Sequence, residues 1–191
     1  MSLKKFTIAK ARALPVLILA DTSGSMLVDG KISVLNEAIQ NMVSTFKQES
    51  ARQAEIQVGL ITFGGDQAEM HLPLARASDI EAIEPLNAKG RTPMGHAFEL
   101  ATQVLENKEL ITSRDYRPVV ILLSDGIPTD DWKSGLEKIR NSDRAQKASR
   151  FAMAIGEEAN IEVLEAFNNA ITHFSVLAAI ANQIFVNIIK D

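Results

Sequence analysis

The sequence contains no cysteine. This absence excludes a disulfide framework and thiolate metal sites, and it suits a protein of the reducing cytoplasm. An excess of positive charge is also missing: the formal net charge is −4, so nothing draws the chain in bulk to nucleic acid or to an anionic membrane. No apolar run approaches the roughly 20 residues of a membrane-spanning helix. We therefore expect a cytoplasmic protein with no nucleic-acid partner and no membrane span.

The motifs of several enzyme classes are absent as well. The sequence has no Gly-x-Ser-x-Gly nucleophile elbow and no Gly-x-x-x-x-Gly-Lys-Ser/Thr phosphate loop. Residues 21–24 resemble the Asp-Thr-Ser-Gly motif of aspartic proteases, but those enzymes are all-β proteins. Haloacid-dehalogenase phosphatases need a second acid two residues after the first, where this chain has Ser23. We therefore expect no catalysis, with a metal-dependent hydrolase as a weaker alternative.

Strand-like and helix-like segments alternate along the chain. The apolar runs 14–21 and 117–126 are typical of strands buried on both faces. Further strands are predicted over 55–64, 150–156 and 172–178, and a short antiparallel edge strand over 68–74, because Pro73 cannot donate to a ladder. Helices are predicted from residue 32, from Thr92 as N-cap, over 130–146, over 161–170 and over 179–191. This order predicts a single α/β domain over residues 1–191, a Rossmann-like three-layer sandwich with a mainly parallel sheet between helices.

Two acids stand at the ends of predicted parallel strands, Asp21 and Asp125. In such sheets the functional site lies outside the carboxyl ends of the strands, so both carboxylates are expected at one edge. Taken singly, each acid could serve only as a turn or cap residue. Together they repel each other and resist burial, and a bound cation removes both problems.

The donors available at this edge indicate which cation would bind. The hydroxyls of Ser23, Ser25 and Thr92 are expected close to the two carboxylates, and the three histidines are dispersed along the chain. A donor set made only of oxygen suits Mg²⁺, Mn²⁺ or Ca²⁺ rather than Zn²⁺ or copper. The sequence therefore predicts a site for a hard divalent cation.

These residues resemble the metal-ion-dependent adhesion site of the von Willebrand factor type A domain. That family carries Asp-x-Ser-x-Ser after its first strand, then a threonine, then an aspartate after a later strand, and all five positions match here as Asp21, Ser23, Ser25, Thr92 and Asp125. The resemblance extends over nearly the whole chain. Within the family, residues 14–26, 90–98 and 124–132 look most like the TerY group of bacterial tellurium-resistance proteins.

The resemblance implies a function as well as a fold. It implies that the three hydroxyls bind the metal more directly than the two aspartates, and that the ion accepts a Glu or Asp carboxylate of a partner protein. The likeness to the TerY group implies a bacterial tellurite or stress-resistance system, with a protein kinase or phosphatase of that system as a partner candidate. The alternative is a degenerate scaffold that binds no metal.

Other residues of the same edge could form the rim of a partner-binding surface. These are Asp29, Gly64, Gly65, Asp66, Asp130 and Trp132. Each also has an ordinary structural interpretation: the glycines suit a hairpin turn, Thr129 or Asp130 would cap the following helix, and Trp132 would pack on the core.

Overall fold

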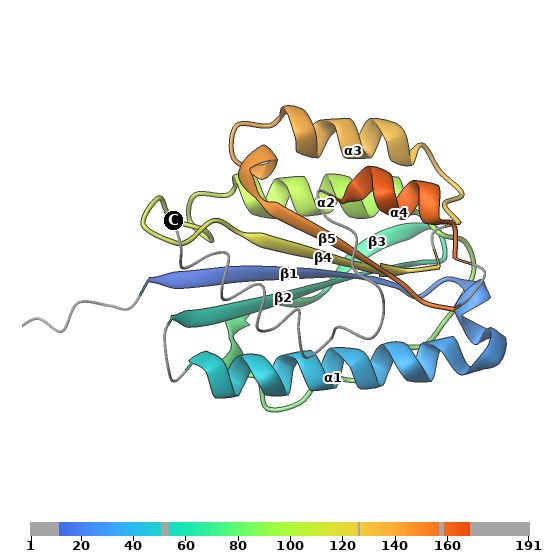
Figure 1. The fold of residues 1–191 in the computed structure, drawn as a ribbon, viewed down its shortest axis with the longest axis horizontal. Helices are drawn as coiled ribbons and strands as arrows, with labels where there is room; N and C mark the ends of the chain where they lie inside the picture. Colours follow the sequence, from blue (N-terminus) through green and yellow to red (C-terminus); the bar gives the residue numbers. More distant parts are fainter. Residues whose placement is uncertain (1–11, 51–53, 126, 157–158, 169–191) are drawn as a thin grey trace, which may run out of the picture.

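A computed structural model of the protein describes residues 12–50, 54–125, 127–156 and 159–168. These residues form a five-stranded sheet of order β3-β2-β1-β4-β5 (Figure 1). Its strands are β1 (Ala13–Asp21), β2 (Glu55–Gly64), β3 (Gln67–Arg76), β4 (Val119–Ser124) and β5 (Ser149–Ala154). β1 pairs in parallel with β2 and with β4, and β4 pairs in parallel with β5; β3 runs antiparallel to β2. The α/β fold with a mainly parallel sheet is therefore confirmed.

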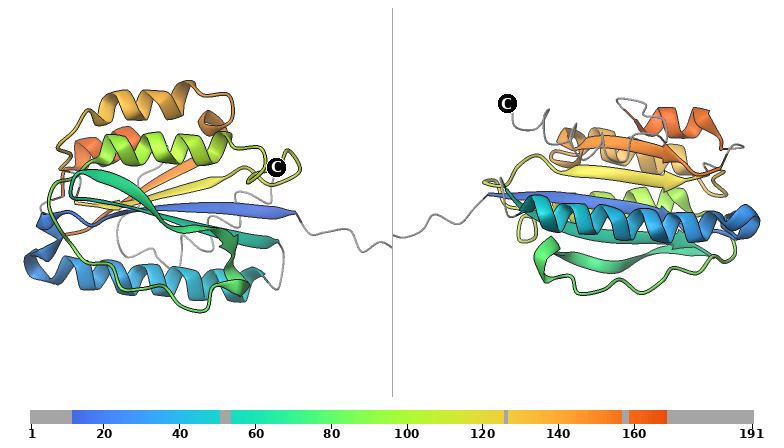
Figure 2. Two further views of the ribbon diagram at one scale, coloured as in Figure 1. Left: turned by 180° about the vertical axis from the view of Figure 1, so that it is seen from behind. Right: turned by 60° about the horizontal axis from the view of Figure 1, so that its bottom comes forward.

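The helices cover both faces of the sheet, which makes three layers (Figure 2). They are α1 (Lys31–Ser50), α2 (Met94–Glu106), α3 (Trp132–Asn141) and α4 (Ile161–Phe167). Successive side chains of a strand point to opposite faces, so β1 supplies Val16 and Ile18 to the core under α1, and Leu17 and Leu19 to the core under α2, α3 and α4. Every residue of β1 is buried, as its unbroken apolar run predicted.

Several boundaries differ from the sequence prediction. β3 is not short, because it extends over ten residues, although the ladder is irregular between the pairs Val58–Ala75 and Leu60–Leu72, where Pro73 supplies no N–H. The helix predicted over 130–146 ends at Asn141 and is followed by a separate 3₁₀ turn at Ala145–Lys147. The strand predicted over 172–178 and the helix over 179–191 lie outside the described residues. No helix within the described residues combines the length and the apolar character needed to cross a bilayer.

Candidate metal-binding edge of the sheet

The segment that follows β1 carries the first three candidate ligands. Ala20 pairs with Leu123, so Asp21 and Ser124 leave the sheet side by side. The Asp21 carboxylate is fully buried and accepts hydrogen bonds from the Ser23 backbone N–H (2.9 Å) and from the Ser124 hydroxyl (2.5 Å). The hydroxyls of Ser23 and Ser25 lie 3.0 Å apart. Three of the five predicted ligands therefore form one compact polar group.

The environment of Asp21 opposes its ionisation. Burial raises its pKa to about 6, and the nearby charge of Asp125 adds to the rise, although the hydrogen bonds from Ser124 and Ser23 partly counter it. A carboxylate kept in this place is costly to ionise without a nearby positive charge. The edge therefore favours a bound cation or a bound proton.

Asp125 is the less satisfied of the two acids. It follows β4 directly, it is 1% exposed, and neither of its carboxylate oxygens accepts a hydrogen bond. Its one ion pair in the described part of the chain is with Lys31, whose Nζ lies 3.5 Å from Oδ2. Buried polar groups nearly always have hydrogen-bond partners, so a buried carboxylate whose two oxygens accept no hydrogen bond is a candidate ligand.

Thr92, the fifth candidate, is buried and held from two sides. Its backbone N–H donates to the Thr129 hydroxyl (3.0 Å), and its carbonyl accepts from the Thr129 N–H (3.0 Å). The preceding residues join the segment after β1, since Gly24 N–H donates to the Gly90 carbonyl (2.9 Å) and Lys89 N–H donates to the Thr22 carbonyl (2.7 Å). The structure thus brings the segments carrying all five predicted ligands to one edge of the sheet.

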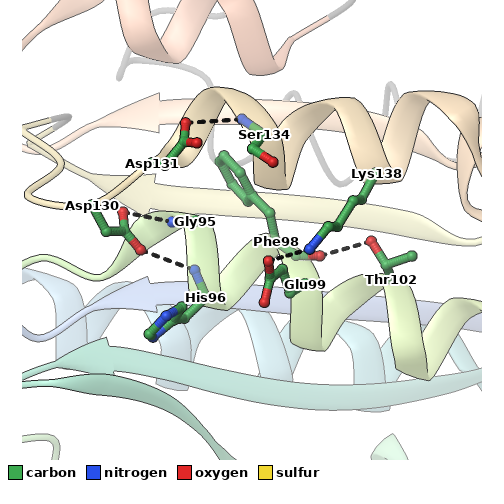
Figure 3. Close-up of polar contacts among 9 residues, drawn as sticks. All are labelled: Gly95, His96, Phe98, Glu99, Thr102, Asp130, Asp131, Ser134 and Lys138. Atoms are coloured by element: carbon green, nitrogen blue, oxygen red, sulfur yellow. Dashed lines mark hydrogen bonds and ion pairs between the residues drawn. The ribbon is translucent and has the colours of Figure 1, made fainter.

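Asp130 caps a helix other than the expected one. Its carboxylate accepts from the backbone N–H groups of Gly95 (2.9 Å) and His96 (3.1 Å) at the start of α2 (Figure 3). The expectation that Thr129 or Asp130 caps α3 is wrong, because Asp131 accepts from the Ser134 N–H there. Thr92 is not the N-cap of α2 either. Pro93 takes that position, and its side chain makes no capping hydrogen bond.

Replacing Asp130 with alanine should lower the free energy of unfolding by about 1–2 kcal/mol, because two N–H groups at the start of α2 lose their acceptor. Thermal or urea denaturation checks this value. Asp131→Ala is the matched control, since it removes a single cap bond from α3, and its effect should be smaller. Equal effects for the two variants would contradict the assignment of Asp130 to α2.

The remaining predicted rim residues lie at the same edge, where Gly64 ends β2 and Trp132 opens α3. Asp29 is exposed, with a φ of 52°, in the 3₁₀ segment Gly24–Gly30 that joins β1 to α1. Gly65 donates to the carbonyls of Lys89 and Arg91, and Asp66 is exposed beside it. Trp132 is half-buried against the core under α2, and the Lys133 ammonium lies 5.6 Å from its ring centroid. Their role in binding a partner stays a prediction.

Several exposed apolar side chains lie in the segments that follow the strands at this edge. Leu27 is 64% exposed and Val28 is 54% exposed, and both follow the first three candidate ligands. Ile127, 51% exposed, comes two residues after Asp125, and Ile161, 47% exposed, opens α4. These side chains are candidates for contact with a partner protein if they prove to form one contiguous patch.

The donor set limits which metal would fit. Among the described residues, no three His, Cys, Asp or Glu side chains are placed to hold a metal ion together. The candidate site offers two carboxylates and three hydroxyls instead, a hard oxygen set of low charge. The Asp125 carboxylate, which accepts no hydrogen bond, fits such an ion together with the buried Asp21.

Comparison with known proteins decides the family. Residues 16–127 match the model of the von Willebrand factor type A domain, and this span includes all five candidate ligands. The chain belongs to the von Willebrand factor type A family. The family resemblance inferred from the sequence is therefore confirmed, whereas the narrower TerY grouping stays a prediction.

Solved structures show how widely this VWA fold is shared. Proximal thread matrix protein 1 from the mussel byssus matches with a TM-score of 0.69 and 18% identity, over 92% of this chain and 48% of that one. A von Willebrand factor type A protein from Catenulispora acidiphila matches with a TM-score of 0.65 and 20% identity, over 91% and 42%. The manganese-loaded TRAP protein of Plasmodium vivax matches with a TM-score of 0.66 and 17% identity, over 88% and 72%. The chain thus spans about half the length of the mussel protein. No curated protein matches it in sequence.

Two residues of the VWA edge escaped the sequence interpretation. Ser124 donates to Asp21, and Lys31 pairs with Asp125. Ser124 could have been found, because a hydroxyl next to Asp125 on a strand adjacent to β1 must leave the sheet near Asp21. Lys31 carried no such signal, since a lysine at the start of a helix is usually a solvated surface residue.

Proposed function

We propose that this VWA domain is a protein-binding module that depends on a divalent cation. The residues that would hold the ion, Mg²⁺ or else Mn²⁺ or Ca²⁺, are Asp21, Ser23, Ser25, Thr92 and Asp125. When bound, the ion supplies positive charge and a coordination position for an anionic oxygen. One observation carries the proposal: a buried Asp125 carboxylate with no hydrogen bond stands beside a buried Asp21.

The family and its solved members support the same function. VWA domains often mediate metal-dependent protein interactions and are typically not enzymes. One structure of similar fold, the TRAP protein of Plasmodium vivax, is manganese-loaded. We extend this property to the present chain because its own donors are all oxygens, which suits Mn²⁺ and Mg²⁺.

The partner we propose is a protein that offers a Glu or Asp carboxylate to the ion. Hydroxyl-rich ligation leaves a divalent cation with much of its positive charge, so an added carboxylate is favoured. The exposed Leu27, Val28 and Ile127 would contact apolar side chains beside that carboxylate. On the likeness to the TerY group, the setting would be a cytoplasmic tellurite or stress-resistance system, and the partner a kinase or phosphatase of that system.

Titration calorimetry of chelator-treated protein with Mg²⁺, Mn²⁺ and Ca²⁺ tests the metal site. We expect saturable binding at one site, weakened at least tenfold in Asp21→Ala, because a buried ligand is lost. Asp66→Asn is the matched control, since it removes an exposed acid from the same edge and should leave the affinity unchanged. Equal affinities for wild type and Asp21→Ala would contradict the ligand assignment, and no binding of any ion would favour the metal-free scaffold.

The ion pair of Lys31 with Asp125 favours this metal-free scaffold. A protein cation already lies where a metal would neutralise the acid. The scaffold alternative does not explain why both Asp125 oxygens lack hydrogen bonds, since a structural carboxylate is usually anchored by several.

A further inference from the structure

We propose that Lys31 is a tethered cation that competes with the divalent ion for Asp125. In the metal-free protein its ammonium neutralises Asp125, and on metal binding this ion pair breaks. The inference rests on the proposed function, because it assigns Asp125 to the metal site. It adds a residue outside the five ligands that sets how tightly the ion is held.

The position of the Lys31 side chain is fixed by its surroundings. Its Nζ lies 3.5 Å from Asp125 Oδ2, and the side chain is only 15% exposed. The hydrocarbon stem lies against Gly156 after β5, where an added Cβ would come 2.6 Å from Lys31 Cε and 3.3 Å from Nζ. Gly156 has a φ of 89°, a conformation that favours glycine. The backbone after β5 thus leaves room for the lysine stem alongside Asp125.

The place of Lys31 in its helix makes a purely local role unfavourable. It is the first residue of α1, where the helix dipole is positive and a lysine is destabilising. The attraction of Asp125 therefore accounts for the placement of this charge, because a buried carboxylate without a cation is costly.

Competition follows from the charges involved. A divalent ion bound to Asp125 would lie close to the Lys31 ammonium, and like charges at such short range repel strongly in a partly buried site. Either the ammonium moves away or the ion binds weakly. A partner carboxylate adds negative charge and shifts the balance toward the ion. Metal and partner are therefore expected to bind cooperatively, each tighter in the presence of the other.

Lys31→Met tests the competition, because methionine keeps an unbranched stem without the charge. We expect Mn²⁺ to bind Lys31→Met roughly ten- to a hundredfold more tightly than wild type in titration calorimetry. Lys47→Met is the matched control: it removes the same charge from the last turn of α1, roughly 24 Å along the helix, and should leave the affinity unchanged. Unchanged or weaker binding by Lys31→Met would overturn the inference.

Thermal unfolding of the metal-free proteins tests the ion pair independently. Lys31→Met should unfold at a lower temperature than Lys47→Met, although loss of a helix-start cation by itself would raise the midpoint. In an Asp125→Asn background, Lys31→Met should no longer lower the unfolding midpoint. If the midpoint still falls there, the ion pair with Asp125 is not the cause. If wild type binds Mn²⁺ and Lys31→Met binds no more tightly, this inference alone fails. If neither protein binds Mn²⁺, Mg²⁺ or Ca²⁺, both the proposed function and the proposed competition are wrong.

Discussion

Replacing Gly64 with alanine should remove about 4 kcal/mol from the free energy of unfolding, the largest effect that we expect of a single methyl group in this protein. An added Cβ at Gly64 would lie 2.3 Å from the Thr22 carbonyl oxygen and 2.5 Å from its hydroxyl. The Thr22 carbonyl oxygen belongs to the backbone and also accepts a hydrogen bond from the Lys89 N–H. It therefore cannot move away by a rotamer change, as a side-chain atom could. The segment that carries Asp21, Ser23 and Ser25 would have to move.

The matched control for Gly64→Ala is Gly59→Ala in the same strand, β2. There the nearest atom to an added Cβ is the Leu17 Cδ1, at 3.0 Å, and a leucine side chain can shift. Urea denaturation followed by circular dichroism should show a change below about 1 kcal/mol for this control. Similar losses in the two variants would mean that strand propensity, and not the contact with Thr22, sets the cost.

The metal-free protein should lose up to about 3 kcal/mol of stability between pH 4 and pH 6 through Asp21 alone. Burial raises the pKa of Asp21 to about 6, whereas an unfolded aspartate titrates near 3.9. Because the pKa of the folded state is the higher one, the native state holds the proton more tightly. The stabilisation by that proton is complete below about pH 4, declines as the pH rises, and is lost above about pH 6.

The contribution of Asp21 is isolated by comparing wild type with Asp21→Asn, since other carboxylates titrate in both proteins. Denaturation midpoints are measured for both proteins from pH 4 to pH 7.5 in the presence of a chelator. As the pH rises, the stability of Asp21→Asn relative to wild type should increase and then level off above about pH 6. Saturating Mg²⁺ should reduce the decline in wild type, because a bound cation favours the ionised carboxylate. A constant difference across this range would show that Asp21 is not perturbed by burial.

The strands of this VWA domain could be predicted from the sequence because their signals are local. An unbroken apolar run gave β1, and alternation with a glycine-rich turn gave β2 and the antiparallel β3. The two acids at strand ends could then be assigned to one edge, since parallel strands share a direction. The hydroxyls of Ser23, Ser25 and Thr92 could be placed nearby in the same way, and the family resemblance then assigned them to the metal site.

The cap residues could not be predicted because they connect loops that are distant in sequence. Asp130 follows β4 and would be expected to cap the helix immediately after it, yet it caps α2, 35 residues earlier. Lys31 likewise meets Asp125 only after β1 and β4 pair. The spacing of residues along the sequence does not predict such contacts, because they depend on how two loops pack once the sheet has formed.

The central place of β1 has a mechanical consequence. Three of the five proposed ligands, Asp21, Ser23 and Ser25, lie at or just after the end of β1, which pairs with β2 over Ala13–Asp21 and with β4 over Val16–Ala20. A pull along this strand would strain both ladders in shear, so many hydrogen bonds must break together rather than one after another. A complex formed at this edge would therefore transmit tension to the domain chiefly through the sheet.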